Sequence, residues 1–444
     1  MTFVVVMGLA LTQFLLALLA PVRLVYLTLL IGAMPWFVLV EGAVDTPVGS
    51  LNGVSLQLFT LCIAAIVVLV ANAELVSRYF ARCRWHFLFA AFCALSLVYA
   101  PSFSYGLRTL AKLLGPAVIC MMVMVSVRTP QQLAMTGRTI FISGIMLCIL
   151  AYVSRAMGLD SRYNGEIPGL GPPGMGPPVF AAHMLVVSMF ALSTFLSGRR
   201  LWALGLTVLF AVSLLGAVQR TTAAAMMIGF SVIMFFGSRG LPRLVMPAAS
   251  ILGLPLLMIF NDGFRKRMFF TATDPDAILK DPGTALQGLD GSGRFGLWDV
   301  ALQKFFTPSP VLGSGIGATQ HFLQQQGTDQ KIGVVHSEYV RLLCEVGLIG
   351  LVLFLIAMGV YLARLRFLAA TTPERKYALA AMGALIGYML YMATDNSFDY
   401  VNQFGAYVFA LIALSEKAKE FASATSEEAA PAVTLSLRPV NLMQ

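Results

Sequence analysis

The sequence predicts an all-α polytopic membrane protein. Of its 444 residues, 58% are hydrophobic and 11% are charged, whereas about 25% are charged in an ordinary soluble protein. Apolar runs of about 18 to 22 residues recur along the chain, and a helix of that length crosses roughly 30 Å of hydrocarbon. Helices are expected because every backbone polar group in lipid must be satisfied within its own segment.

The apolar segments alternate with breaks of two kinds. Arg and Lys side chains fill one kind, as at 78–84, 128–138, 199–200, 239–243 and 364–376, and these breaks face the cytoplasm under the positive-inside rule. The other breaks, which include 158–177, 218–220 and 395–402, then face outward. The segments themselves lie near 3–19, 24–41, 53–73, 85–100, 106–127, 138–157, 178–197, 200–217, 221–236, 243–260, 339–363, 376–394 and 403–415.

One long outward break divides the chain into four parts. We expect N-terminal transmembrane helices in 1–260, an outer loop in 261–338 and C-terminal transmembrane helices in 339–415. A cytoplasmic tail in 416–444 should begin as a short helix end and continue as disordered chain. The side on which the N-terminus lies stays open. Within the loop, Arg294 to Phe306 is amphipathic, which predicts a helix that lies on the bilayer or covers a cavity. Phe295, Trp298, Leu302 and Phe305 form its apolar face.

Composition argues against several other classes of site. The net charge of +9 reflects topology rather than nucleic-acid binding, because Lys and Arg fall in short breaks. The six cysteines are scattered and the four histidines lack ligand spacing, so neither a disulfide framework nor a metal centre is predicted. Asp274-Pro-Asp276 is interpreted as a turn, and the glycines from Gly313 to Gly317 as a site of close backbone packing.

Two arginines at outer ends of predicted spans are candidate anion ligands. Arg220 lies at the tip of the hairpin 218–222, where an external Arg either binds an anion or anchors the chain at lipid headgroups. Arg294 follows Gly291-Ser-Gly at the start of the amphipathic helix, whose free N–H groups suit phosphate. A solvated surface arginine is the alternative interpretation for this second residue.

A candidate base lies at the outer N-terminal end of a span. His336 occupies that position, where the helix dipole favours the neutral imidazole that a general base requires. A structural histidine is the alternative. Tyr339 shares its helical face, and Arg341 and Glu345 have the spacing of an i,i+4 ion pair.

Two further cations are secondary candidates. Arg108 and Lys112 share one face near the outer end of their span. They either extend a phosphate site or pair with a loop carboxylate.

These pieces occur in a recognisable order. An outward hairpin Arg is followed by Ser-Gly-Arg before a Trp-bearing helix, then by Pro-x-x-Gly-x-Gly-x-Gly, then by His at the head of a span with Glu-x-Gly-x-x-Gly. Between about 200 and 365 the chain therefore resembles the superfamily of bacterial O-antigen ligases and O-antigen polymerases. The sequence departs from the pattern at Ser337, where many relatives have Asn, and in 169–178, which lacks the usual Asn.

The resemblance implies a glycosyltransferase of the GT-C type with about 12 transmembrane helices, located in the bacterial inner membrane with its active site facing the periplasm. The donor would be a glycan on undecaprenyl diphosphate and, for a ligase, the acceptor would be a sugar hydroxyl of the lipid A-core. Arg220 and Arg294 would bind the donor diphosphate and His336 would activate the acceptor. No cofactor or metal is expected, and direct displacement would invert the anomeric centre.

Other functions stay open at this stage. An O-antigen or exopolysaccharide polymerase, or a protein O-oligosaccharyltransferase, would use similar residues with a different acceptor. A secondary transporter, from a different class, would also explain the spans. It is disfavoured because the polar residues cluster at one membrane face and no internal repeat is evident.

Overall fold

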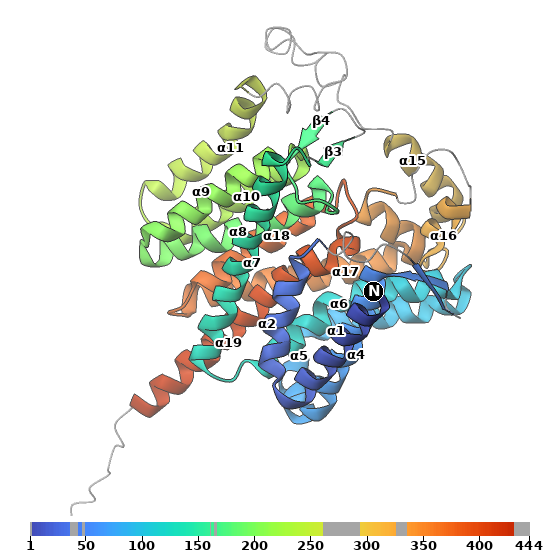
Figure 1. The fold of residues 1–444 in the computed structure, drawn as a ribbon, viewed down its shortest axis with the longest axis horizontal. Coiled ribbons are helices and arrows are strands. Elements are labelled where there is room, and N and C mark those ends of the chain that lie inside the picture. The colour runs from blue at the N-terminus through green and yellow to red at the C-terminus, as the bar shows by residue number, and fades with distance from the viewer. Residues whose placement is uncertain are drawn as a thin grey trace, which may run out of the picture.

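The computed structural model describes residues 2–35, 43–46, 49–159, 161–163, 167–260, 294–325 and 335–429. A helical bundle forms most of the protein (Figure 1). The N-terminal helices are α1 (Thr2–Leu19), α2 (Pro21–Gly32), α4 (Gly53–Ala71), α5 (Ala73–Leu95), α6 (Phe103–Ser126), α7 (Pro130–Ala156), α8 (Pro177–Gly198), α9 (Leu201–Gly216), α10 (Arg220–Gly237) and α11 (Pro242–Phe260). The C-terminal helices are α15 (Arg294–Ala301), α16 (Ala318–Gln325), α17 (Glu338–Thr371), α18 (Lys376–Tyr391) and α19 (Ala406–Ala429).

Short irregular elements connect these helices. A π-helical turn, Leu302–Phe306, continues α15, and the 3-10 turn Ser397–Tyr400 with the π turn Val401–Gly405 leads into α19. Another 3-10 turn, Ser96–Tyr99, follows α5. Two antiparallel hairpins pair β1 (Ala43–Thr46) with β2 (Gly49–Asn52) and β3 (Ser161–Tyr163) with β4 (Ile167–Gly169).

The predicted multi-pass helical architecture is confirmed. Among the described residues, six helices are long and apolar enough to cross a membrane, and four shorter apolar helices accompany them. The two small hairpins were not part of the all-α prediction. They lie in the Gly- and Pro-containing breaks around 42–52 and 158–177, where the chain leaves one helix before it enters the next.

Predicted boundaries were wrong at three basic breaks. Arg138 lies inside α7, which begins at Pro130, and Arg364 and Arg366 lie inside α17, which ends at Thr371. The basic residues Arg78, Arg82 and Arg84 were expected in a loop, but they lie inside α5, which begins at Ala73. Charge alone does not end a helix, since Arg has a high helix propensity and no Gly or Pro interrupts this stretch. The amphipathic segment, in contrast, is helical from Arg294 as predicted.

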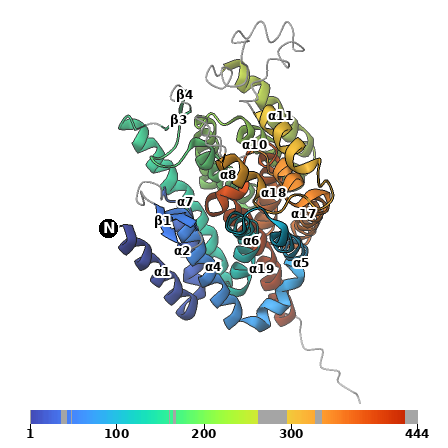
Figure 2. The same cartoon turned by 90° about the vertical axis from the view of Figure 1, so that its right-hand side faces the viewer.

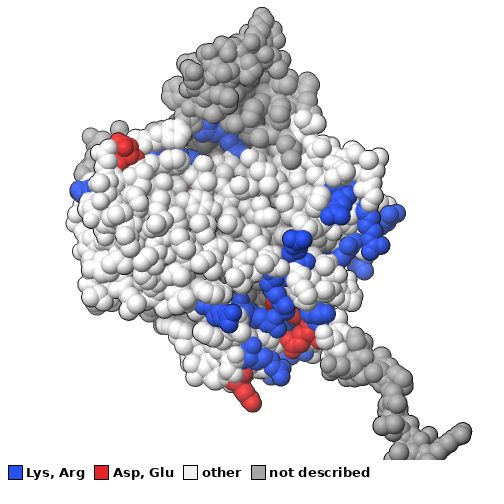
Figure 3. Space-filling model, turned by 180° about the vertical axis from the view of Figure 1, so that it is seen from behind, with Lys and Arg blue, Asp and Glu red and all other residues white. Residues whose placement is uncertain are grey.

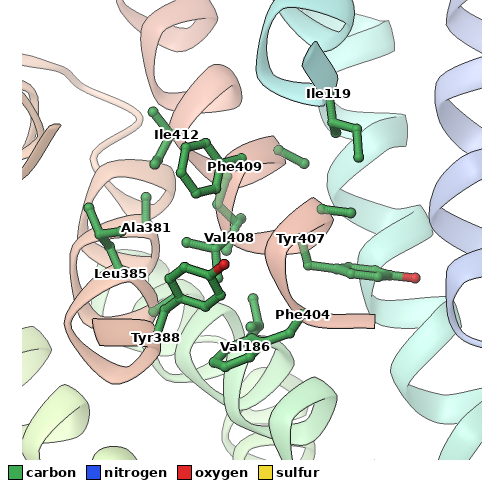
Figure 4. Close-up of a cluster of buried hydrophobic side chains, with 14 of the residues drawn as sticks. Ile119, Val186, Ala381, Leu385, Tyr388, Phe404, Tyr407, Val408, Phe409 and Ile412 are labelled. Carbon is green, nitrogen blue, oxygen red and sulfur yellow. The ribbon is translucent and has the colours of Figure 1, made fainter. Parts of the chain in front are cut away.

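The core lies where the C-terminal helices enter the bundle. α18 packs against α8, α10 and α19, while α19 also packs against α6. Figure 2 shows this arrangement from the side on which α15 lies. In Figure 4 Tyr388, Phe404 and Phe409 gather in this core while Tyr407 points to the other side of α19, and the Tyr388 and Phe404 ring centroids are 4.8 Å apart. Both ends of the segment that joins α18 to α19 are thereby fixed.

A kink in α17 receives the glycine-rich loop. Gly347 interrupts the helix with φ 66° and ψ −168°, and a Cβ there would lie 2.3 Å from the carbonyl oxygen of Val311. On the loop side, Gly313 has φ 73° and a Cβ there would meet the backbone of Glu345 at 2.5 Å. Two backbones therefore touch directly, as predicted for the glycines between Gly313 and Gly317.

Candidate functional site

A short segment between α18 and α19, Thr394 to Asn396, contacts His336, Arg294 and the hairpin that carries Arg220. Asp395 lies beside His336, and Asn396 binds the backbone of His336. Thr394 contacts both Arg294 and the hairpin that carries Arg220. We call these three residues the connecting segment.

His336 is held in an unusual backbone conformation at the mouth of α17. Its φ of 55° lies in the left-handed region, which costs a non-glycine residue about 1–3 kcal/mol. Its backbone N–H donates a hydrogen bond to Asn396 Oδ1 at 3.1 Å. The preceding carbonyl, that of Val335, accepts a hydrogen bond of 2.9 Å from Trp298 Nε1. The α15 helix and the connecting segment therefore fix the backbone of His336 from two sides.

The imidazole of His336 faces a buried carboxylate. Its Nδ1 lies 3.6 Å from Asp395 Oδ1 and 3.4 Å from Asn396 Nδ2. The separation from Asp395 exceeds a hydrogen bond and is an electrostatic contact. The side chain of His336 is 33% exposed, while that of Asp395 is 4% exposed. One ring nitrogen thus faces a fixed negative charge, and the ring remains accessible from outside.

Polar neighbours keep Asp395 ionised. Burial by itself raises the pKa of this carboxyl, but His336, Tyr391, the Asn396 backbone and the positive charge of Arg294 together hold the pKa below its ordinary value. Tyr391 donates its hydroxyl to Asp395 Oδ2 at 2.8 Å, and the Asn396 N–H donates to Oδ1 at 2.8 Å. Donors therefore compensate the buried charge.

Arg294 and the Arg220 hairpin meet at Thr394. Arg294 Nη1 donates a hydrogen bond of 2.6 Å to the Thr394 carbonyl, and the Thr394 and Thr221 hydroxyls lie 2.5 Å apart. Arg220 itself begins α10, directly after Gln219. Val218, in the same hairpin, has φ 53°, which is a genuine outlier for a β-branched residue. The fold retains backbone strain on both sides of the connecting segment, at Val218 and at His336.

The secondary candidates have structural partners. Lys112 Nζ lies 2.5 Å from Asp399 Oδ1, so it pairs with a loop carboxylate, one of the two alternatives left open by the sequence. Tyr339 donates its hydroxyl to the Met389 carbonyl of α18 at 2.7 Å. Arg108 places its guanidinium 5.6 Å from the centroid of the Tyr105 ring.

A buried charge network lies behind His336 in the first turns of α17. Arg341 Nε lies 3.6 Å from Glu345 Oε1, as the i,i+4 spacing predicted, and Arg341 Nη1 lies 3.4 Å from Glu338 Oε2. Glu338 accepts the N–H of Phe398, and Glu345 accepts the N–H of Gly317. The network therefore joins α17 to the glycine-rich loop and to the turn after the connecting segment.

The amphipathic helix packs onto the protein through its predicted apolar face. Trp298, Leu302 and Phe305 join a small core with Val335 and Cys344. Phe295 points outward and is 63% exposed. The helix therefore covers the start of α17, on the side of the molecule where α15 and α16 are labelled in Figure 1. The Gly291-Ser-Gly turn and the Asp274-Pro-Asp276 motif lie outside the described residues.

Sequence reasoning missed the connecting segment. Asp395 and Asn396 were noticed only as part of an outward break. The aspartate follows the end of an apolar span, which is the signal that could have identified it, because a carboxylate at that position needs a partner.

Fold and site together define a multi-pass helical membrane protein with a polar cluster of cations, a histidine and a carboxylate at one set of helix ends. Residues 185–355 match the family model described as O-Antigen ligase. The match confirms the resemblance of this part of the chain to the O-antigen ligase superfamily.

Other comparisons add little. No curated protein matches the chain. A chain from a solved structure, described as structural coordination of polymerization and crosslinking by a peptidoglycan synthase complex, is similar at 18% identity and a TM-score of 0.45. The similarity covers 76% of the present chain and 98% of that chain.

Proposed function

We propose that the protein is an O-antigen ligase of the GT-C type with about twelve spans, located in the bacterial inner membrane with its site facing the periplasm. It transfers a glycan from undecaprenyl diphosphate to a sugar hydroxyl of the lipid A-core. The observation that carries the proposal is the approach of His336 Nδ1 to the buried Asp395, 3.6 Å away, next to the arginine-binding Thr394. An accessible base, Arg294 and the hairpin that carries Arg220 thus meet at one connecting segment.

The chemistry of the reaction explains this set of residues. Undecaprenyl diphosphate is already a good leaving group, so the enzyme has to neutralise the developing charge on the phosphates and remove a proton from the acceptor. Arg220 and Arg294 neutralise the diphosphate, since guanidinium groups bind phosphate oxygens in a bidentate way. These groups suffice without a metal ion.

His336 acts as the general base. As the acceptor oxygen attacks the anomeric carbon, the bond from that carbon to the diphosphate oxygen breaks, and Nε2 of His336 takes the hydroxyl proton. The charge that then forms on the imidazole lies beside ionised Asp395, which stabilises it. Attack from the side opposite the leaving group inverts the anomeric centre.

The test compares the lipopolysaccharide of the host before and after deletion of the gene. Core-only lipopolysaccharide together with long glycan on undecaprenyl diphosphate supports a ligase. Core capped with a single repeat unit would instead identify a polymerase, and unchanged lipopolysaccharide would favour protein glycosylation or transport.

Variants then test the residues. Arg220→Ala, Arg294→Ala and His336→Ala should each abolish transfer in the complemented host while the protein remains inserted and folded. Arg138→Ala, which removes an exposed arginine outside the site, is the matched control and should retain transfer. Transfer should also persist in chelator, and a strict requirement for a divalent metal would contradict the proposed chemistry.

A further inference from the structure

A second group of arginines surrounds a cavity at the opposite ends of the helices that form the site. Arg199 follows α8, Arg239 follows α10 and Arg375 precedes α18. All three line an open cavity of about 810 Å³. We call it the arginine cavity. Three separate helix connections therefore bring one arginine each to the same space.

Connectivity places the arginine cavity across the bundle from His336. α10 begins at Arg220 and ends at Gly237, and this end lines the cavity. A helix of its 18 residues is about 27 Å long, close to the roughly 30 Å of a bilayer's hydrocarbon core. The cavity therefore lies at the level of lipid headgroups on the side opposite the proposed active site.

Among the described residues, the arginines of this cavity lack the carboxylate partners that arginines have in a second cavity. A smaller cavity near α5 holds Arg82 and Arg364, and both of these pair with Glu416. Within the described part of the chain, neither Arg199, Arg239 nor Arg375 lies within ion-pair distance of a carboxylate. Figure 3 shows two groups of Lys and Arg on one face of the protein. The group at the right has no described acidic residue beside it, whereas the lower group contains Asp or Glu. The arginine cavity carries uncompensated positive charge.

Backbone conformation also argues for a built site. Arg199 adopts φ 49° at the end of α8, a position that usually takes Gly or Asn. Arg375 Nη2 donates a hydrogen bond of 3.0 Å to the Gly237 carbonyl, which fixes its guanidinium at the end of α10. Arg199 is therefore held in a strained backbone conformation, and Arg375 is held in a fixed orientation.

The remaining lining is apolar. Phe195, Leu196 and Met246 contribute to the wall. A ligand that fits has a phosphate for the guanidinium groups and a hydrocarbon portion for these side chains. Basic pockets between membrane helices are known to take such headgroups.

We propose that the arginine cavity binds the phosphate headgroup of an anionic phospholipid. The bound lipid joins the connections after α8, after α10 and before α18, so it braces the helices whose other ends carry the connecting segment and the Arg220 hairpin. The proposal goes beyond glycan transfer and does not depend on it, because it concerns a different surface and a different ligand.

The experiment measures lipid binding to the purified full-length protein by native mass spectrometry in detergent. Phosphatidylglycerol is the probe and phosphatidylcholine is the comparison lipid. The test variant is Arg199→Gln/Arg239→Gln/Arg375→Gln. The control, Arg84→Gln/Arg138→Gln/Arg366→Gln, removes the same charge at exposed positions outside the arginine cavity.

We expect the test variant to bind phosphatidylglycerol at least about tenfold more weakly, since each arginine near an anionic lipid contributes about fivefold. The control should change by less than about threefold, because its arginines share no cavity. Equal losses in both variants would overturn the proposal, as would equal binding of the two lipids by the unmodified protein. Competition by millimolar inorganic phosphate would assign the site to a free anion and would also overturn it.

Discussion

Replacing Asp395 by Asn removes the charge beside His336 while keeping nearly the same shape. The native carboxylate receives donors on both oxygens, from Tyr391 on Oδ2 and from the Asn396 backbone on Oδ1. An amide can accept on one side only. The substituted side chain would therefore lose at least one of these donors. In either orientation of the amide, the negative charge that faces His336 Nδ1 is absent.

The separation of 3.6 Å sets the scale of the effect. At an effective dielectric constant of about 20, two unit charges at that distance interact by about 4 to 5 kcal/mol. Water screens part of this, because the His336 side chain is one-third exposed. We therefore expect the variant to lose about 1.5 to 3 kcal/mol of transition-state stabilisation, which is about a 10- to 150-fold fall in the transfer rate.

The assay measures initial rates of glycan transfer from undecaprenyl-diphosphate-linked donor to lipid A-core by the purified protein in proteoliposomes. Tyr391→Phe serves as the matched control, because it removes one hydrogen bond to Asp395 and keeps the charge. Its rate should fall less than that of Asp395→Asn, because the negative charge beside His336 remains. Thermal unfolding of each variant in detergent identifies the ones that are folded.

A cycle with His336→Ala decides whether Asp395 acts through the histidine. If it does, Asp395→Asn should not lower the residual rate that purified His336→Ala retains in proteoliposomes, because the base that the carboxylate supports is already absent. Independent, multiplicative losses in the double variant would refute the reasoning. So would a folded Asp395→Asn protein that transfers glycan at the native rate.

Three further predictions concern stability in detergent. Arg341→Met should lower the free energy of unfolding by about 3–5 kcal/mol, because two carboxylates stay buried without their cation; an unchanged melting temperature would contradict this. Gly347→Ala should abolish folded protein while Gly359→Ala, with open space at its Cβ, should not; equal yields would contradict the kink's role. Burial raises the pKa of Asp399, but Lys112 and Arg341 hold that pKa below its ordinary value. This carboxylate therefore stabilises the fold above its ordinary pKa and loses that effect as the pH falls through the depressed value. Lys112→Met should move acid unfolding to higher pH, and an unshifted acid limb would argue against the pair.

Local sequence patterns predicted much of the fold because they concern neighbours along the chain. The apolar face of Trp298, Leu302 and Phe305 repeats at helical spacing, and the structure buries it. The pair of Arg341 and Glu345 lies one turn apart on a single helix. Periodicity determines both features, so no knowledge of the tertiary fold was needed.

Long-range partners could not be predicted in the same way. His336 and Asn396 are 60 residues apart, and their contact depends on how α17 and α18 pack. The start of α5 was predicted too late, because Arg78 and Arg82 were interpreted as part of a loop although the helix runs through them. Residue type could have indicated that Asp395 needs a partner, but only the packing of the bundle determines which one.

The buried charges explain why the site at His336 depends on distant parts of the chain. Burying an ion costs several kcal/mol, so the network of Arg341, Glu338 and Glu345 is tolerated only when every partner is in place. Those partners include the N–H groups of Gly317 and Phe398, which belong to two different segments of the chain. The glycine-rich loop and the turn that follows Asn396 must therefore dock on α17 together, and their docking positions the connecting segment beside His336. A change in the loop that leaves Glu345 without its donor should consequently disturb the contact between His336 and Asp395, although no loop residue touches either side chain among the described contacts.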